Sequence, residues 1–446
     1  MLHRLRVAWR VLRAEGAGGF RDRTLDHRAE AARRRAYVPL PPGWRPEAPI
    51  PVLLVTSAPP VPWLGGVPSQ LRTRLAAEER LRPVALLYPT GSAWRLEVRA
   101  GTRRWFLEMP GAAPSPFALE DAGFEQTVRA ARERVGAHAV HAEGLAGLPP
   151  ASLLHLAREG PLLLSLHDFA AFCPRPHLIE EPVLRFCHYS TDPDRCARCL
   201  AETATWQGTR RALTAELLTT AAAVVFPSDF LRQIHGELFP GVPADARRRW
   251  CVVEPPIAST SSLERRTPGP LHHAALVGSV QPHKGAAVFA ETVRLLEGEG
   301  LRWSAYGGGD AEHLATLRRL GVRVRGYYRA GSLPERLRRD GVDVALLLSV
   351  WPEAHNLVLS ECVAAGVPVV AFDLGALGER VPRLGAGRLV TLEQGAAGIA
   401  AALRAMQRDG LPKVPAAVLT GPEEAAAALR EVYGALGLLA LEGPFA

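Results

Sequence analysis

Short apolar runs that alternate with helix-like stretches are the feature that most constrains how this chain folds. The segments "IPVLLVTSAPP", "PVALLYPT" and "PLLLSLHD" each hold an apolar run that ends in proline or polar residues. Stretches typical of helices, such as "PSQLRTRLAAEERL", lie between several of them. Strands that are apolar throughout are buried on both faces, as in parallel sheets covered by helices. The pattern therefore predicts an α/β protein with doubly wound parallel sheets.

The alternation breaks once, at residues 252–273, which are rich in proline and serine, as linkers are, and it then restarts. A length of 446 residues suits two domains better than one core. The predicted organisation is a basic N-terminal appendage (1–49), a Rossmann-like domain (50–255) with a Cys-rich insertion (173–199), a linker (256–270), a second Rossmann-like domain (271–420), and C-terminal helices (421–446) that pack back across the domains.

Composition and charge narrow the class of protein. With 48% hydrophobic and 22% charged residues, and no apolar run near the ~18 residues of a membrane span, the sequence is typical of a soluble protein. The N-terminus lacks the apolar core and cleavage site of an export signal, so we expect a cytoplasmic protein. The net charge of +8 is almost all in residues 1–45, where 11 arginines face four acids. A nearly neutral remainder argues against nucleic acid as a partner.

The basic N-terminal stretch has an apolar side. Leu2, Leu5, Trp9 and Leu12 fall near one face of a helix with arginine around it. That pattern suits an anionic membrane surface or a protein partner, so peripheral contact with the inner face of the membrane is one prediction. The alternative is a terminal helix that packs on its own domain.

The segment "WPEAHNLVLSE" (351–361) holds two glutamates, eight positions apart, around a predicted helix start. The amino end of a helix near His355, Asn356 and Leu357 presents backbone N–H groups and a positive dipole, which suit a diphosphate. Glu353, just before the helix, would hold sugar hydroxyls, and Glu361, two turns in, would accept the ribose hydroxyls. The alternatives are two helix-surface glutamates or a glycosidase acid/base pair, and the latter leaves the phosphate-binding parts unexplained.

Lys284, in "GSVQPHKG", is one of only two lysines among 53 basic residues. Its ammonium group would add a point charge on the phosphates of the ligand. Phosphate charge grows as a glycosidic bond to a leaving diphosphate breaks, so Lys284 would act most strongly in the transition state.

These motifs resemble the nucleotide-sugar domain of the GT-B glycosyltransferases, in particular the retaining family GT4. "GSVQPHKG" stands where the family has a strand, a loop and Lys-Gly, and residues 351–381 stand where it has Glu, seven residues, Glu, a helix and a Pro-Val-Val strand. In the first half, "PPVPWLGGVPSQ" resembles the family's Gly-Gly loop, and "LHDF" resembles its histidine at the interdomain cleft. The similarity covers roughly residues 50–410.

The resemblance implies two Rossmann-like domains facing a central cleft, and transfer of a sugar from a nucleotide-diphosphate donor to a hydroxyl of a carbohydrate or lipid-linked acceptor. It implies retention of configuration, no catalytic metal, and a role in polysaccharide, glycolipid or glycoconjugate synthesis. It places His167 with Glu353 on the sugar, Gly65 and Gly66 near the donor phosphates or the acceptor, and Arg325 near the base. The alternatives are a histidine that caps a buried strand end and an ordinary glycine turn.

One residue departs from the family pattern. The family has arginine directly after the strand-ending glycine, where this chain has Ser279, which cannot bond phosphate bidentately. His283 or Arg325 are candidates to compensate. Two other functions therefore stay open besides the glycosyltransferase: a nucleotide-sugar epimerase or phosphorylase of the same fold, and a non-catalytic nucleotide-sugar-binding protein.

Four of the six cysteines fall within 27 residues: Cys173, Cys187, Cys196 and Cys199. In a reducing compartment such clustering favours metal over disulfides. A Cys₄ set would hold a structural zinc ion, since four thiolates leave no open position for catalysis. The alternative is free thiols, or a disulfide after oxidation.

Overall fold

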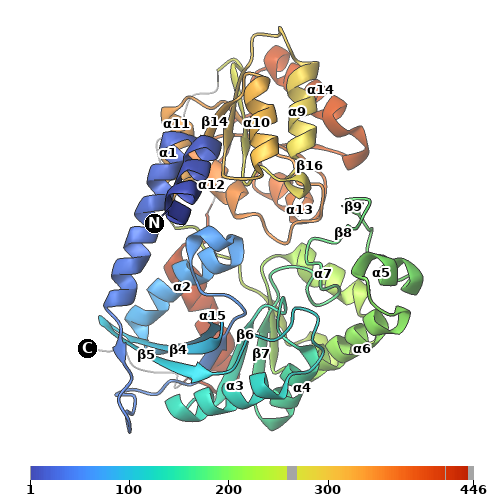
Figure 1. Ribbon diagram of the computed structural model, residues 1–446. Helices are drawn as coiled ribbons and strands as arrows, with labels where there is room; N and C mark the ends of the chain where they lie inside the picture. The colour runs from blue at the N-terminus through green and yellow to red at the C-terminus, as the bar shows by residue number, and fades with distance from the viewer. Residues whose placement is uncertain (1, 259–268, 417, 440–446) are drawn as a thin grey trace. The chain divides into compact units, whose positions relative to one another are not determined.

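The computed structural model describes residues 2–258, 269–416 and 418–439, and it confirms the predicted α/β class (Figure 1). The chain divides into two compact units, each of which joins two separate stretches of sequence. We call Ala32–Pro256 with Thr420–Ala446 the amino-terminal unit, and Met1–Ala31 with Ile257–Leu419 the carboxy-terminal unit. Both chain ends thus belong to the unit formed mainly by the other half of the sequence. No described helix is both long and apolar enough to cross a membrane.

The amino-terminal unit is built on a nine-stranded sheet in the order β1-β5-β4-β3-β2-β6-β7-β10-β11. Every neighbouring pair is parallel except the pairs that β4 makes with β3 and β5. The strands are β1 (Val38–Pro39), β2 (Val52–Val55), β3 (Val84–Pro89), β4 (Ala93–Ala100), β5 (Arg103–Pro110), β6 (Ala139–Glu143), β7 (Leu162–Ser165), β10 (Ala223–Phe226) and β11 (Trp250–Val252). The short strands β8 (Ile179–Glu180) and β9 (Arg185–Phe186) pair with each other in the Cys-rich insertion.

Helices flank this sheet because its central strands are apolar on both faces. All four residues of β2 are buried, as are those of β7 and β10. The helical elements are η1 (Pro62–Leu64), α2 (Gly66–Leu81), α3 (Ala122–Val135), α4 (Pro150–Glu159), α5 (Pro193–Leu200), α6 (Ala204–Thr220), α7 (Asp229–Leu238), α8 (Ala244–Arg247) and α15 (Pro422–Ala435).

The last helix, α15, completes the amino-terminal unit. It packs beside α2, so the red end of the chain lies within a unit built mainly of early residues (Figure 1). Leu429 and Tyr433 join the apolar cluster under β2, and the Tyr433 hydroxyl lies 2.8 Å from Nδ1 of His141 on β6. The C-terminal segment therefore belongs to the core of this unit.

The carboxy-terminal unit holds a six-stranded parallel sheet in the order β14-β13-β12-β15-β16-β17. Its strands are β12 (His273–Val277), β13 (Arg302–Tyr306), β14 (Arg323–Gly326), β15 (Val344–Leu347), β16 (Val369–Phe372) and β17 (Gly387–Val390). Its later helical elements are η2 (Pro282–Lys284), α9 (Ala286–Leu295), α10 (Ala311–Arg319), α11 (Leu333–Arg339), α12 (Leu357–Ala365), α13 (Ala376–Arg383), η3 (Leu392–Gln394) and α14 (Gly395–Asp409).

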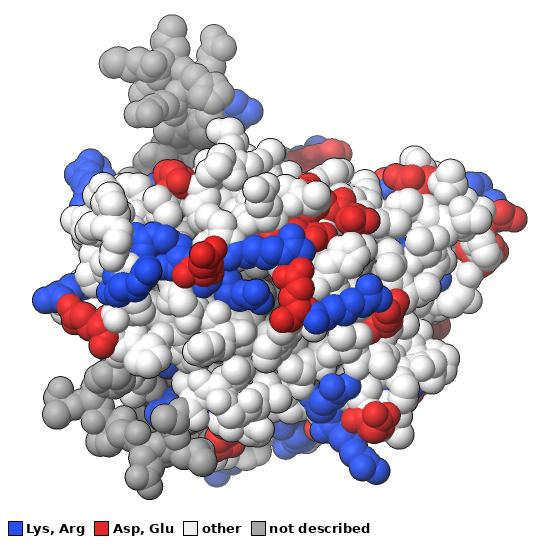
Figure 2. Space-filling view, turned by 90° about the horizontal axis from the view of Figure 1, so that it is seen from below, with Lys and Arg blue, Asp and Glu red and all other residues white. Residues whose placement is uncertain are grey.

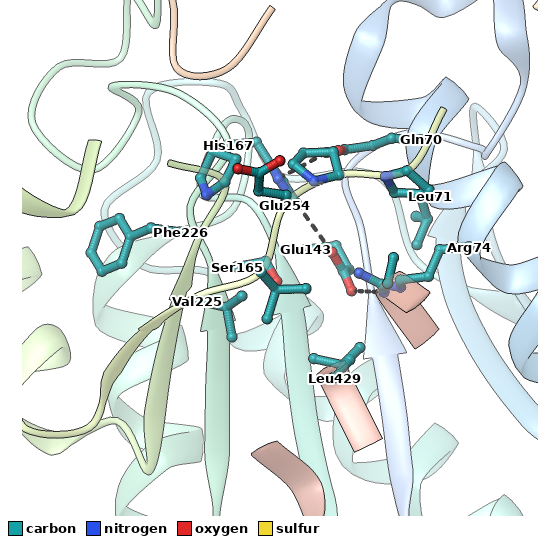
Figure 3. Close-up of a pocket in the computed structure, with 15 residues that line it drawn as sticks. Gln70, Leu71, Arg74, Glu143, Ser165, His167, Val225, Phe226, Glu254 and Leu429 are labelled. Carbon is teal, nitrogen blue, oxygen red and sulfur yellow. Dashed lines mark hydrogen bonds and ion pairs between the residues drawn. The ribbon is translucent and has the colours of Figure 1, made fainter. Parts of the chain in front are cut away.

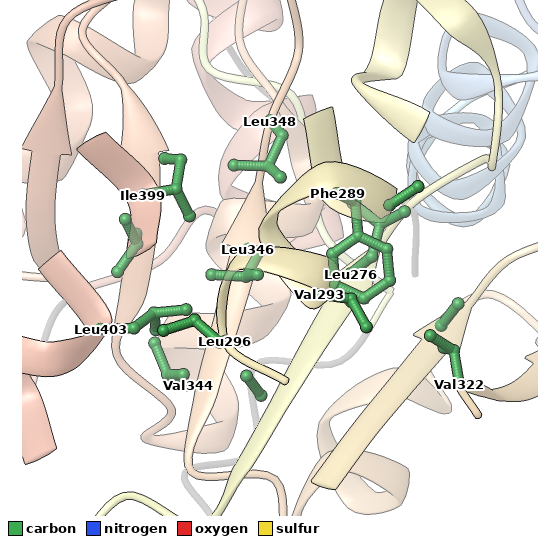
Figure 4. Packing of buried hydrophobic residues seen from close by; sticks show 14 of the residues in the cluster. Leu276, Phe289, Val293, Leu296, Val322, Val344, Leu346, Leu348, Ile399 and Leu403 are labelled. Carbon is green, nitrogen blue, oxygen red and sulfur yellow. The ribbon is translucent and has the colours of Figure 1, made fainter. Parts of the chain in front are cut away.

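Alternate residues of the strands in this sheet serve two separate cores. Val344 and Leu346 of β15 face Phe289 of α9 and Leu403 of α14, in the cluster drawn in Figure 4. Ala345 and Leu347 join the other cluster, which includes side chains from α11, α12 and α13. The doubly wound arrangement predicted from the apolar runs is present in this unit.

The first helix, α1 (Leu2–Arg35), is interrupted at Gly16, whose φ of 75° and ψ of 175° are not helical. Its residues up to Ala31 cluster with the carboxy-terminal unit, whereas the sequence predicted a separate appendage over 1–49. Of the apolar face proposed for membrane contact, the side chains of Leu2 and Leu5 lie outside the described residues, and Trp9 is 63% exposed. Most of the predicted linker, 259–268, also lies outside the described residues.

Charges of both signs mix on the surface. On the face shown in Figure 2, basic and acidic side chains lie next to one another rather than in one continuous basic field. Exposed ion pairs such as Arg95–Glu108, Arg129–Glu159 and Arg158–Glu216 show the same mixing in the amino-terminal unit.

Candidate functional site

In open parallel sheets, ligands bind at the carboxyl ends of the strands. In the carboxy-terminal unit, Lys284 follows β12 and Glu353 follows β15, and these two strands are neighbours. Nζ of Lys284 lies 2.8 Å from Oε1 of Glu353 and 5.2 Å from the ring centre of Trp351. Ser349 donates a second hydrogen bond to the same carboxylate oxygen. Two residues that are 69 positions apart, and that the sequence singled out, therefore form one ion pair.

The charge state of Glu353 follows from this pairing. Burial alone would raise the pKa of Glu353, whose exposed fraction is 6%. The charge and hydrogen bond of Lys284, with the hydrogen bonds from Ser349 and Asn356, outweigh burial, so the pKa of Glu353 lies below its usual value and the carboxylate is ionised at neutral pH.

Gly285 explains how Lys284 reaches this position. Its φ is +79°, and a Cβ atom there would overlap the carbonyl oxygen of Leu348 at the end of β15. Val350 also donates its backbone N–H to the carbonyl of His283, at 3.0 Å. Only glycine allows the turn that carries Lys284 to lie this close to β15.

Helix α12 begins at Leu357, two residues later than the start near His355 that the sequence predicted. Asn356 is the N-cap: its φ is 68°, and its side-chain oxygen accepts a hydrogen bond from Leu359 N at 2.8 Å. His355 and Asn356 therefore lie in the turn before the helix, and Leu357 is its first residue. The amino end of α12 follows Glu353 directly in the chain, as the diphosphate hypothesis requires.

Arg380, which was not predicted from the sequence, fixes the turn at His355 and Asn356. Its guanidinium group is buried and donates to the carbonyls of His355 (2.8 Å) and Asn356 (3.1 Å) and to Oγ of Ser360 (2.8 Å). An arginine in "GERV", 24 residues beyond the cap, carried no local signal of this role. The backbone before α12 is thus fixed by a side chain from α13.

Glu361 lies in α12 and is 9% exposed. Burial raises the pKa of Glu361 to about 7, although a hydrogen bond from the backbone of Gly331 opposes the shift. Burial, and then the nearby charge of Glu361, raise the pKa of Tyr328. Glu361 therefore faces residues 327–332, the loop between β14 and α11, and it titrates near neutral pH.

Two further predicted residues lie at the strand ends. Arg325 of β14 pairs with Asp340 at 3.0 Å, and Asp340 also accepts a hydrogen bond from Tyr306 at 2.7 Å. The predicted contact of Arg325 with a base would have to compete with this pair. Ser279 follows Gly278, at the end of β12, and is partly exposed.

In the amino-terminal unit, His167 lies in a pocket with residues that sequence reasoning missed (Figure 3). Nε2 of His167 is 3.1 Å from Glu143, and Nδ1 is 2.9 Å from the amide nitrogen of Gln70. The amide nitrogen of Gln70 is a hydrogen-bond donor and the carboxylate of Glu143 is an acceptor, so in this arrangement Nδ1 accepts and Nε2 donates. Arg74 pairs with the other oxygen of Glu143. An acid at the end of an apolar run was the one signal for Glu143.

Glu143 stays ionised in this pocket. Burial would raise the pKa of Glu143, but Arg74 and the neighbouring histidines hold it well below its usual value. Glu143 in turn fixes the ring of His167, whose side chain is 11% exposed. Gln70 and Arg74 project from α2, which begins at Gly66, and its N-cap Gly65 has a φ of 119°. The glycine loop therefore positions the helix that holds His167.

The four clustered cysteines have half-buried side chains that form no disulfide. Cys187 directly follows β9, and Cys196 and Cys199 lie three residues apart in α5. Burial raises the pKa of Cys173 to about 11, and the charge of Cys187 acts in the same direction. Among the described residues, the group of possible metal ligands within 4.8 Å of one another is Glu120, Glu125 and His155. No three of the four cysteine sulfurs, all of which lie among the described residues, form such a group.

Residues 272–409 match the sequence model of the family "Glycosyl transferases group 1". This match lies within the carboxy-terminal unit. The matched stretch contains Lys284, Glu353 and Glu361, so the resemblance to glycosyltransferases inferred from the two motifs is confirmed for this stretch, whereas the assignment to family GT4 stays a prediction. A comparison of the chain with curated proteins gives no significant match.

Solved structures share the fold across both units. The Anabaena protein HepE in complex with UDP is 15% identical, with 87% of this chain and 97% of HepE covered and a TM-score of 0.52. HepE in complex with UDP-glucose is 14% identical, with 87% and 100% covered and the same TM-score. Sucrose-phosphate synthase from Thermosynechococcus elongatus is 16% identical, with 87% and 94% covered and a TM-score of 0.54. At these identities the likeness establishes the fold, which is that of GT-B glycosyltransferases.

Proposed function

We propose that this protein is a glycosyltransferase that moves a sugar from a nucleotide-diphosphate donor to an acceptor hydroxyl, with retention of configuration and without a catalytic metal. One observation carries the proposal: the Lys284–Glu353 pair lies at the ends of two adjacent parallel strands, directly before the amino end of α12. A cation, a helix start and an ionised carboxylate together suit a sugar diphosphate.

The donor would be held by three parts of this site. Lys284 and the turn at His355, Asn356 and Leu357 bind the diphosphate, Glu353 binds sugar hydroxyls, and Glu361 binds the ribose. A carboxylate accepts hydrogen bonds from hydroxyls best when ionised, so donor binding would draw a proton from Glu361. The structures of HepE with UDP and with UDP-glucose support a nucleotide-sugar ligand for this fold.

The proposed reaction depends on how this site stabilises the negative charge that develops on the leaving diphosphate. The bond from the anomeric carbon to the diphosphate oxygen breaks, and the acceptor oxygen forms a new bond on the same face of the sugar. The acceptor proton passes to the departing diphosphate oxygen. Lys284 and the positive end of α12 stabilise the negative charge that grows on the diphosphate. No protein nucleophile is needed for this route.

The amino-terminal unit would supply the acceptor side. We propose that His167, fixed by Glu143 and Gln70, contacts the transferred sugar, and that the loop at Gly65 and Gly66 approaches the donor or the acceptor. The acceptor is proposed to be a carbohydrate or a lipid-linked sugar, in polysaccharide, glycolipid or glycoconjugate synthesis. The proposed location is cytoplasmic, with peripheral membrane contact through residues 1–45.

A structural zinc ion is a separate proposal for Cys173, Cys187, Cys196 and Cys199. Four thiols within one insertion are a suitable donor set, and Cys187 is close enough for its charge to act on Cys173. Zinc binding would require the sulfurs to draw together. Metal analysis of the purified protein tests this proposal, and less than about a tenth of an equivalent of zinc would contradict it.

A thermal-shift screen of nucleotide sugars tests the proposed donor site. We expect a shift for at least one donor that is lost in Lys284→Ala and Glu361→Ala and kept in Lys413→Ala, which removes the other, exposed lysine of the same unit. Equal shifts in all variants would contradict the site. Product analysis with and without acceptors separates transfer from epimerisation or phosphorolysis, and binding without turnover over a broad acceptor panel would favour a non-catalytic binding protein.

A further inference from the structure

The stretch from Glu15 to Asp26 in α1, which we call the α1 segment, lies against the ligand edge of the carboxy-terminal sheet. A Cβ atom at Gly19 would be 2.8 Å from Tyr327 N and 3.1 Å from Gly326 Cα, at the end of β14. A Cβ atom at Gly308, just after β13, would be 2.7 Å from the Glu15 carboxylate. Glycines on both sides therefore allow the α1 segment to approach the ends of β13 and β14 closely.

Three buried acids hold the α1 segment in place. Glu15 accepts hydrogen bonds from Arg23, whose guanidinium group lies 4.6 Å from the ring centre of Tyr327. Asp22 pairs with Arg336 of α11. Asp26 accepts hydrogen bonds from the Tyr327 hydroxyl at 2.7 Å and from Arg329 Nε at 2.9 Å.

The partners of Asp22 and Asp26 belong to the part of the unit that faces Glu361. Tyr327 and Arg329 lie in the loop from 327 to 332, and its Gly331 donates a backbone hydrogen bond to Glu361. Arg336 lies on α11, which packs on α12, the helix that carries Glu361. Asp26 is thus linked to Glu361 through one short loop.

Buried ion pairs contribute little net stability compared with apolar packing of the same volume. The α1 segment has three buried acids at positions where apolar side chains of similar volume would attach it to the unit equally stably. Three buried acids therefore fit a role in positioning the 327–332 loop better than a role in stabilising the fold.

We propose that the α1 segment is a built-in wall of the nucleotide site, in which Asp26 is a positioning residue that holds the 327–332 loop against Glu361. This inference rests on the proposed function, because it assigns the same site a nucleoside ligand. It also gives the N-terminal stretch a role within the enzyme instead of that of a separate appendage.

Nucleotide titration of full-length variants tests the proposal. UDP and GDP are titrated by calorimetry into the wild type, Asp26→Asn and Tyr327→Phe, and into Glu291→Gln as a matched control. Glu291 forms an exposed 3.0 Å pair with Arg294 in α9 of the same unit. We expect Kd to rise on the order of tenfold in Asp26→Asn and about threefold in Tyr327→Phe, with no change in the control. Tyr327→Phe removes one hydroxyl and provides the test if Asp26→Asn does not fold.

A double-mutant cycle with Glu361→Gln separates positioning from general destabilisation. If Asp26 acts through Glu361, its substitution adds little to the Kd of Glu361→Gln. Full additivity, or unchanged affinity in both Asp26→Asn and Tyr327→Phe, would overturn this inference alone. A wild-type protein that binds neither UDP nor GDP, nor any donor of the thermal-shift screen, would overturn the proposed function and this inference with it.

Discussion

Each of the two units places an ionised carboxylate at the end of a parallel strand, but the two carboxylates have different surroundings. Glu143 is enclosed by Arg74, whose side chain is 10% exposed, and by His167. Glu353 pairs with Lys284, whose side chain is 26% exposed. The comparison suggests that the first pair is a fixed clamp that orients a histidine. The second pair has a cation that a ligand phosphate can reach.

The largest expected effect tests the clamp. Arg74→Met should lower the free energy of unfolding by about 3–5 kcal/mol, because it leaves Glu143 and Glu78 buried without their shared cation. Urea denaturation measures this change, and Arg80→Met is the control, since Arg80 is an exposed arginine on the same helix. A loss below about 1 kcal/mol would remove the distinction between the two pairs.

For the Lys284–Glu353 pair, we expect a large loss of activity and a small loss of stability. Lys284→Gln keeps a hydrogen-bond donor for Glu353 but removes the charge, so kcat should fall about 100-fold or more, with a smaller loss of stability than in Arg74→Met. Product formation from the donor identified by the thermal-shift screen measures kcat, and Lys413→Gln serves as the control. A Lys284→Gln variant with full activity would show that Lys284 does not stabilise the negative charge on the leaving diphosphate.

The pH dependence of nucleotide binding tests whether Glu361 binds the ribose in its ionised form. Because burial raises its pKa to about 7, the fraction of ionised Glu361 rises about tenfold between pH 6 and pH 8, and Kd for the nucleotide should fall by up to that factor. Glu361→Gln should lose this dependence. A wild-type Kd that is constant over this range would contradict an ionised Glu361 as the ribose ligand.

The same raised pKa predicts the sign of a stability effect. Between the unfolded pKa near 4.5 and the folded value of about 7, the folded chain binds more protons than the unfolded chain, so Glu361 lowers stability as pH rises. Urea denaturation of the wild type and Glu361→Gln should converge at about pH 4 and diverge toward neutral pH, with the variant the more stable. Parallel curves would contradict this burial.

The smallest expected effect concerns the ring of His167. Gln70→Ala removes one neutral hydrogen bond at 2.9 Å and should lower kcat about threefold to tenfold, whereas the hydrogen bond that Nε2 donates to Glu143 still holds the ring. Steady-state kinetics measure the change. An effect as large as that of Lys284→Gln would place Gln70 in direct contact with substrate.

The fold class was readable from the sequence because buried parallel strands are apolar throughout, as in "VLLV" of β2. The antiparallel strand β4 was not assigned, because its charged and apolar residues alternate and it lacks the continuous apolar run by which the parallel strands were recognised. The division into units differs from the predicted boundaries, because contacts such as that of Gly19 with Gly326 join residues about 300 positions apart.

The candidate site was predictable where its residues share one local motif. Glu353, Asn356 and Glu361 occur within nine residues, and their spacing relative to a helix start carries the chemistry. Arg380, Gln70 and Arg74 reach the two sites from other helices, and nothing in their local sequence marks them. The pairing of Lys284 with Glu353 required the strand order, which places β12 beside β15.

The central claim is that Lys284 and Glu361 bind one ligand, and a crystal structure of the protein with the nucleotide that binds most tightly tests it directly. We expect the diphosphate at Lys284 Nζ and the amino end of α12, with the ribose hydroxyls at the carboxylate of Glu361. A nucleotide bound elsewhere, or in contact with only one of these two side chains, would contradict it.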